Sequence, residues 1–275
     1  MIDGLYETIL SKFNHVYFRE QDHSYFINDK EALYSATRLI KKWTPEFDSN
    51  KLAKLVAQKQ GFLPEDILAK WDFDKNYSCF KGTIIHFYIE NFLERKIVEP
   101  NNYEIKSFLE KYHKNNASDL FSTIDDIKEH LKAFKKFYDW WKEEHILIKS
   151  ELVIGDKRLG GIGGMIDNLS YNTKTKKICF FDYKSNKEIH IKNKYKEKLL
   201  FPFNHLDNCE LVKYSLQLLI YKKIFQETTN IQINSEDCKI IWLSKDGIYK
   251  LYDILPLEKE VETIFEFIEK EDNFL

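Results

Sequence analysis

Two charged side chains stand at the end of an apolar run in the stretch ICFFDYKSNK, residues 178–187. Asp182 follows four apolar residues, and Lys184 comes two residues later. Because side chains alternate along a strand, both point to the same face. Burying two charges is unfavourable unless each finds a partner. The two groups therefore either pair only with each other or are held there to meet a ligand.

Two further acids lie in apolar stretches, Glu151 and Asp167. Short polar turns between the stretches predict an antiparallel three-strand meander. Its strands are predicted at residues 146–155, 159–171 and 178–185. Asp167 and Asp182 then face each other on neighbouring strands, and two facing carboxylates repel unless a cation lies between them. A divalent metal such as Mg²⁺ would suit phosphodiester hydrolysis, with Lys184 stabilising the transition state.

Flanking helices supply further polar candidates. His86 and Glu90 share one face of a predicted helix, and a neutral imidazole is a competent ligand for Mn²⁺. Gln217 and Tyr221 are also four residues apart, in an otherwise apolar helix, where they could bind phosphates or orient a catalytic group. The run KEIHIKNKYKEK, residues 187–198, is a basic strip suited to a phosphate backbone. We name three of its lysines as candidates for nucleic-acid binding: Lys187, Lys192 and Lys194.

The elements that must position these residues predict one α/β domain with a mixed sheet flanked by helices. Helices are expected at 81–96, 124–145, 209–227 and 257–271, with strands at 238–245 and 247–254. Residues 1–75 are expected to form an attached N-terminal region, with a hairpin at 15–29 and helices beginning after Ser35 and over 51–72, the latter broken at Gly61 and Pro64. Residues 76–275 are expected to form the core, with a C-terminal helix.

Composition narrows the class of protein. With 43% apolar and 15% aromatic residues, the 275-residue chain can bury a substantial core. A net charge of −2 limits polyanion binding to local patches. No membrane span or secretory signal is predicted. The four cysteines form no C-x-x-C pair, which favours free thiols in the cytoplasm or another reducing compartment and leaves a four-cysteine metal or iron–sulfur site without support from spacing.

The paired motifs GGMIDNLS and ICFFDYKSNK resemble those of the PD-(D/E)XK nuclease superfamily. GTIIHFYIE and YSLQLLIY resemble the flanking motifs of its RecB-like branch, which includes phage-type exonucleases and mitochondrial genome maintenance exonucleases. One departure is that Asp167 follows Met-Ile, not Pro.

The resemblance implies a restriction-endonuclease-like core. It also implies a Mg²⁺- or Mn²⁺-dependent DNA exonuclease acting on ends or single strands, in recombination or repair, and a phage or viral origin fits the branch. It implies the following roles: metal ligands His86, Asp167, Asp182 and the carbonyl of Tyr183; catalytic lysine Lys184; an additional acid, Glu151; and substrate-side residues Gln217 and Tyr221. Members with an iron–sulfur cluster carry a C-terminal cysteine cluster; it is missing here, so that cofactor is not expected.

Two alternatives remain. One is a nucleic-acid- or partner-binding module on the same fold that has lost catalysis, against which the complete set His86, Asp167, Asp182 and Lys184 argues. The other is a carboxylate-pair hydrolase such as a glycosidase, which leaves Lys184 and the lysine strip unexplained.

Overall fold

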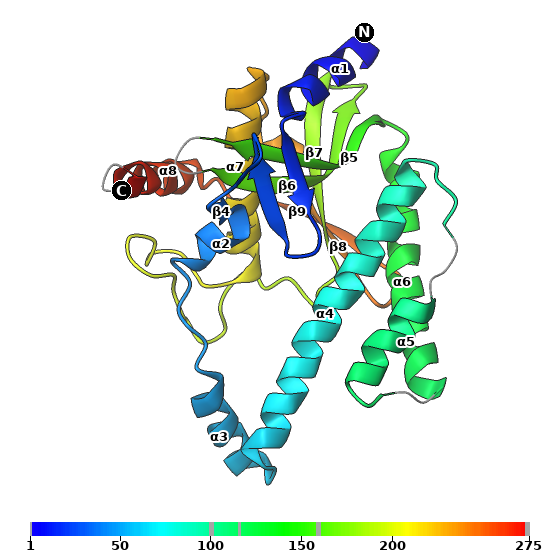
Figure 1. Cartoon of the computed structure of the whole chain (residues 1–275), viewed down its shortest axis with the longest axis vertical. Coiled ribbons are helices and arrows are strands. Elements are labelled where there is room, and N and C mark those ends of the chain that lie inside the picture. Colours follow the sequence, from blue (N-terminus) through cyan, green and yellow to red (C-terminus); the bar gives the residue numbers. More distant parts are fainter. Residues whose placement is uncertain (1, 99–101, 115–116, 158–160, 273–275) are drawn as a thin grey trace.

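A six-stranded mixed sheet lies between two layers of helices (Figure 1). The structure is a computed structural model that describes residues 2–98, 102–114, 117–157 and 161–272. The strands of the sheet are β4 (Tyr34–Ser35), β5 (His145–Asp156), β6 (Ile162–Asn172), β7 (Lys177–Lys184), β8 (Cys238–Leu243) and β9 (Tyr249–Asp253). The predicted fold class, a mixed sheet with an antiparallel meander flanked by helices, is confirmed.

The meander forms the centre of this sheet. β5 pairs with β6 and β6 with β7, both antiparallel, and β7 pairs with β8 in parallel. β6 and β7 are buried on both faces, which explains their near-continuous apolar sequences. On one edge of β6, the start of the strand pairs with β4 and its end, from Asn168, pairs with β7. Residues 164–167 therefore lie between these two ladders.

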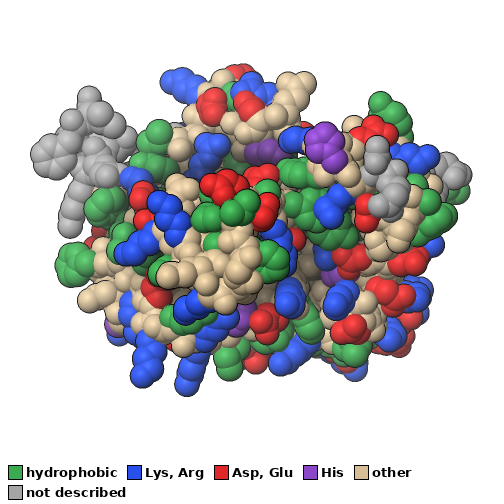
Figure 2. Space-filling model, turned by 90° about the horizontal axis from the view of Figure 1, so that it is seen from below, with side chains coloured by type: hydrophobic (Ala, Val, Ile, Leu, Met, Phe, Trp, Pro, Cys, Tyr) green, Lys and Arg blue, Asp and Glu red, His purple; other side chains and the backbone are tan. Residues whose placement is uncertain are grey.

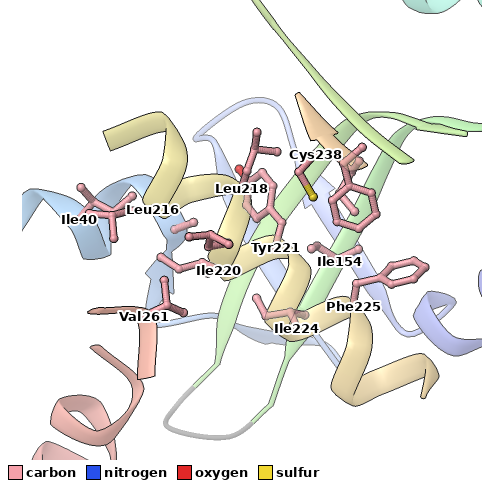
Figure 3. Close-up of a cluster of buried hydrophobic side chains, with 14 of the residues drawn as sticks. Ile40, Ile154, Leu216, Leu218, Ile220, Tyr221, Ile224, Phe225, Cys238 and Val261 are labelled. Atoms are coloured by element: carbon pink, nitrogen blue, oxygen red, sulfur yellow. The ribbon is translucent and has the colours of Figure 1, made fainter. Parts of the chain in front are cut away.

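One face of the sheet is covered by α7 (Glu210–Thr229), with α1 (Ile2–Phe13), α2 (Ala36–Lys41) and α8 (Glu258–Asp272) around it. In Figure 3, Tyr221 and Phe225 of α7 point toward the sheet, whereas Ile220 lies near Ile40 of α2 and Val261 of α8. The helix is thus buried on opposite sides, as its apolar sequence predicted.

The other face is covered by α4 (Pro64–Leu93), α5 (Asn102–Lys111) and α6 (Ala117–Trp141), and α3 (Ser49–Gln60) packs on the first half of α4. Gly61 ends α3 with φ +71, so the predicted break is confirmed. The separate helix predicted at 81–96 is instead the second half of one 30-residue helix, α4, because no helix-breaking residue interrupts 65–81. α5 was not predicted.

The N-terminal region forms a small sheet of β1 (Val16–Arg19), β2 (Ser24–Ile27) and β3 (Lys30–Glu31), which contains the predicted hairpin. Ser35 caps α2 by accepting the Arg38 N–H at 3.2 Å. β4 joins the central sheet, and α4 runs across residues 75 and 76. The division of the chain at that point stays a prediction.

Gly164 of β6 touches α7 closely enough to exclude a side chain. A Cβ atom there would lie 2.2 Å from Cε1 of Tyr221. We expect Gly164→Ala to lower the free energy of unfolding by about 1–3 kcal/mol, because a buried aromatic ring must shift. Denaturant titration measures this, with Gly4→Ala as the control, since nothing lies within 4 Å of a Cβ there. Equal stability of the two variants would contradict the close contact.

Candidate active site

Three acidic side chains form a row across the meander. On β5, Ser150 pairs with Asn168 of β6, and Leu152 pairs with Ile166. Glu151, between the two β5 residues, therefore lies beside Asp167. The β6–β7 register continues from Asn168 opposite Phe181, so Asp167 and Asp182 are the next pair of positions. Glu151 has φ +49, a left-handed conformation that is strained for a residue with a Cβ. The unfavourable backbone conformation thus occurs at the residue whose carboxylate completes the row, Glu151.

His86 of α4 reaches this row from the helical layer. Its Nδ1 lies 3.3 Å from Glu151 Oε1 and 3.7 Å from Asp167 Oδ2. Its Nε2 lies 3.2 Å from the backbone oxygen of Tyr183. Three other predicted site residues, Glu151, Asp167 and Tyr183, therefore meet around the His86 ring.

α4 is fixed on α6 one turn before His86. The Lys81 ammonium donates to Asp126 Oδ2 at 3.1 Å, and the Tyr77 hydroxyl donates to the same oxygen at 2.8 Å. Ile85 and Ile89, on either side of His86, are almost fully buried against the sheet. These contacts leave the His86 ring little freedom to move away from the acids.

Half-buried Lys184 and buried Asp182 form an ion pair at the end of β7. Lys184 Nζ lies 2.6 Å from Asp182 Oδ2, and the Asp182 residue is only 2% exposed. The ammonium also lies 4.7 Å from the centre of the Tyr214 ring. The prediction that both side chains share a face and sit at the end of an apolar strand agrees with this pair.

The packed charges and the burial shift the pKa of four of these groups, Asp167, Asp182, His86 and Lys184. Burial raises the pKa of Asp182 to about 6, with Lys184 opposing the rise and Asp167 adding to it. Burial also raises the pKa of Asp167. The pKa of His86 is raised to about 9, because Asp167 and Glu151 outweigh the lowering effect of burial. For Lys184, burial lowers the pKa, but Asp182 and Asp167 outweigh it and the net shift is upward.

Backbone and side chain of Tyr183 hold β7 against Asp167. The Tyr183 N–H donates to Asp167 Oδ2 at 2.7 Å. On the opposite face, the Tyr183 ring packs against Phe134 and Phe137 of α6, and Asn168 Nδ2 donates to its hydroxyl at 2.8 Å. A tyrosine in the core thereby fixes the carbonyl that faces His86.

Gln217 and Tyr221 of α7 contact each other rather than the carboxylates. Gln217 Nε2 donates to the Tyr221 hydroxyl at 2.7 Å, and the Tyr221 ring lies on Gly164. Burial raises the pKa of Tyr221, and the charges of Asp182 and Asp167 add to that rise, so the phenol lies within electrostatic range of both. Their role toward a substrate stays a prediction.

Sequence reasoning missed two tyrosines beside the acids. Tyr214 lies under Lys184, and Tyr25 of β2 lies on Gly163, where a Cβ would come within 2.3 Å of it. The pKa of Tyr25 is raised by burial and by the charges of Asp167 and Glu151. Tyr214 could have been found, because it precedes Gln217 by three residues on the same helix face.

The remaining candidates lie outside the cluster. Lys187, Lys192 and Lys194 are exposed on the segment that follows β7. Glu90 forms part of no metal-ligating group among the described residues. Cys79 is exposed, whereas Cys179, Cys209 and Cys238 are buried. No helix in the described part of the chain combines the length and apolarity needed to cross a membrane.

The donor set at the centre fits a divalent cation. Among the described residues, one nitrogen of His86 and one oxygen each of Glu151 and Asp167 lie within 4.8 Å of one another. Carboxylate oxygens with one imidazole suit Mn²⁺ and Mg²⁺. Glu151 thus stands where the predicted ligand set had Asp182, whose carboxylate is paired with Lys184. The predicted ligands stay a proposal.

Comparisons with known proteins add one structural likeness. No family model matches the chain, and no curated protein matches it. A crystal structure of a protein from Eubacterium rectale described as a "Putative exonuclease" aligns with 69% of this chain at 10% identity and a TM-score of 0.38. The chain spans 64% of that protein's length.

The raised pKa of His86 predicts a pH-dependent stabilisation of the metal-free protein. Its pKa is about 9 in the folded state against 6.5 ordinarily, so the contribution of charged His86 is complete below 6.5 and is lost as pH rises through 9. In chelator, wild type should therefore be more stable than His86→Gln at pH 6, with the difference shrinking toward pH 9. Chemical denaturation across this range measures it, and a constant difference would contradict the assignment.

Proposed function

We propose that this protein is a metal-dependent nuclease that hydrolyses phosphodiester bonds in DNA, with Mg²⁺ or Mn²⁺ as cofactor. The observation that carries the proposal is the meeting of His86, Glu151 and Asp167 within 4.8 Å, next to the ion pair of Asp182 and Lys184 on the adjoining strand. Hard oxygen donors with one imidazole suit such a cation, and a cationic side chain beside it suits the negative charge of a phosphate.

His86, Glu151 and Asp167 would hold the cation, with Asp182 and the Tyr183 carbonyl as candidates for completing the set. The bound cation would acidify a water molecule and neutralise charge on the phosphate. His86 carries a proton near neutral pH, since its pKa is about 9, and must release it to ligate. Binding of the cation should therefore release a proton.

Lys184 is the residue we assign to the developing charge. Its raised pKa keeps the ammonium charged at neutral pH, and Asp182 holds it at 2.6 Å. An ammonium fixed before the reaction stabilises negative charge on the phosphate oxygens without reorganising. Asp182 is thus a positioning group for Lys184 as well as a candidate ligand.

The structure favours catalysis over an inactive binding module on the same fold. A binding module has no need for the Lys184–Asp182 pair next to a strained residue, Glu151, and two buried carboxyl groups with a raised pKa, because such an arrangement destabilises the fold. Exonuclease action, preference for ends or single strands, and a role in repair or recombination belong to this proposal as expectations from the motif resemblance.

Removing the lysine tests the site. We expect Lys184→Ala to lower the rate of DNA cleavage by about a hundredfold or more, because an electrostatic stabiliser of the transition state is lost. Gel assays with end-labelled and circular DNA measure this. Lys245→Ala is the matched control, since it removes an exposed lysine from the turn between β8 and β9. Undiminished cleavage by Lys184→Ala would reject the assignment.

Metal removal tests the chemistry. We expect excess EDTA to stop cleavage and added Mn²⁺ to restore it, because His86, Glu151 and Asp167 then regain the cation. Asp167→Asn should remain inactive after Mn²⁺ is added while its circular dichroism spectrum stays native. Turnover that persists in chelator would exclude the mechanism.

A further inference from the structure

The segment between β7 and α7, residues 185–209, begins directly after Lys184 and contains no helix and no strand beyond one isolated bridge. We call it the connecting segment. It contains five lysines against three acidic residues, whereas the whole chain carries a net charge of −2. The connecting segment is therefore a locally basic part of a nearly neutral protein. It follows β7, the strand that carries Asp182 and Lys184.

Two large aromatic side chains project from it. Tyr195 is 79% exposed and Phe201 is 83% exposed. An isolated exposed apolar residue needs no explanation. Two exposed rings among lysines on one short segment are a different pattern, because ring faces and ammonium groups together are what a single nucleic-acid strand requires.

Phe201 is held out by buried neighbours. Leu199 and Phe203, two residues to either side, are each 2% exposed. The Phe203 ring packs edge-on against Trp43 at 5.2 Å, and the Leu200 N–H donates to the Trp43 oxygen at 2.7 Å. The backbone on both sides of Phe201 is thus attached to the core near α2, so the ring has little freedom to fold back.

Tyr195 is positioned by a side-chain hub. The Tyr195 N–H donates to Asn193 Oδ1 at 2.8 Å. Asn193 Nδ2 in turn donates to the Asn208 oxygen at 2.8 Å, and the Asn193 N–H donates to Asp207 Oδ2 at 3.2 Å. These bonds join Asn193 to the end of the connecting segment, so Tyr195 is displayed on an ordered turn and not on a free loop.

The lysines beside the rings have few acidic partners. The Lys194 ammonium lies 5.1 Å from the centre of the Tyr195 ring, and Lys192 lies within electrostatic range of Asp207. Lys198 pairs with Asp207, whereas in the described part of the chain no ion pair is formed by Lys192, Lys194 or Lys196. All three are exposed. Figure 2 shows the underside of the molecule, where lysine and arginine side chains lie beside hydrophobic and acidic groups. The connecting segment lies on the left side in Figure 1.

We propose that Tyr195 and Phe201 form a stacking platform for unpaired bases, with Lys192, Lys194 and Lys196 holding the phosphates, so that the connecting segment binds single-stranded nucleic acid. Bases in a duplex are already stacked and cannot use exposed rings, whereas a single strand offers the face of every base. The proposal rests on the proposed nuclease function and deepens it, because it names a single strand as the substrate form that this side of the site receives.

Binding measured without cleavage tests this platform. In EDTA, fluorescence anisotropy should show that the wild-type protein binds a labelled single-stranded oligonucleotide more tightly than the same sequence as a blunt duplex. Tyr195→Ala and Phe201→Ala should each weaken single-strand binding between about fivefold and a hundredfold, because each loses one stacked base. Tyr195→Phe and Phe201→Trp should retain wild-type affinity, since the ring is kept.

Phe121→Ala, which removes a 63% exposed phenylalanine from α6, is the matched control and should bind as wild type does. Lys192→Ala should reduce the slope of log affinity against log salt concentration by about one, because one phosphate contact is lost. Unchanged affinity in both aromatic variants, or no single-strand binding by wild type, would overturn the platform. Cleavage assays separate the two proposals. If the wild-type protein cleaves DNA but both aromatic variants bind the single strand normally, the platform is rejected and the nuclease function stands. If binding depends on the rings but the wild-type protein cleaves no DNA, the nuclease function is rejected and the platform stands.

Discussion

The mutual repulsion of three carboxylates held in a row is the constraint on which the rest of the structure depends. Glu151, Asp167 and Asp182 come from three adjoining strands; the two aspartates are buried and Glu151 is half-buried. Such negative charges are stable only if positive groups compensate them. In this protein His86 lies beside Glu151 and Asp167, and Lys184 pairs with Asp182. A divalent cation that replaces the proton of His86 would compensate the carboxylate charges more completely. This need for a cation links the fold to a metal-dependent reaction.

The surrounding elements keep this row in place. α4 brings His86 to the sheet and is fixed to α6 by the Lys81–Asp126 pair. α7 lies on Gly164 through Tyr221, so the strand that carries Asp167 cannot shift without displacing a buried ring. The N-terminal hairpin adds Tyr25 on Gly163. Because these contacts come from both helical layers and from the N-terminal region, the site is a property of the whole domain.

Much of this could be predicted from sequence, and the missing parts have physical reasons. Strand periodicity and short turns located the meander, and an acid at the end of an apolar run marked Asp182. β4 is two residues long, too short for any pattern, so its place in the sheet was invisible. The approach of Tyr25 depends on how a hairpin docks, which local sequence does not encode. The role of Glu151 depends on a left-handed backbone conformation that only the fold reveals.

Anomalous scattering from a crystal of the protein grown with Mn²⁺ would locate the cation. We expect one strong peak at ligand distance, about 2.0–2.6 Å, from a nitrogen of His86 and an oxygen of Asp167, with Glu151 or Asp182 completing the contact. A fully loaded crystal whose manganese lies elsewhere, with His86 still bonded to the bare carboxylates, would contradict it.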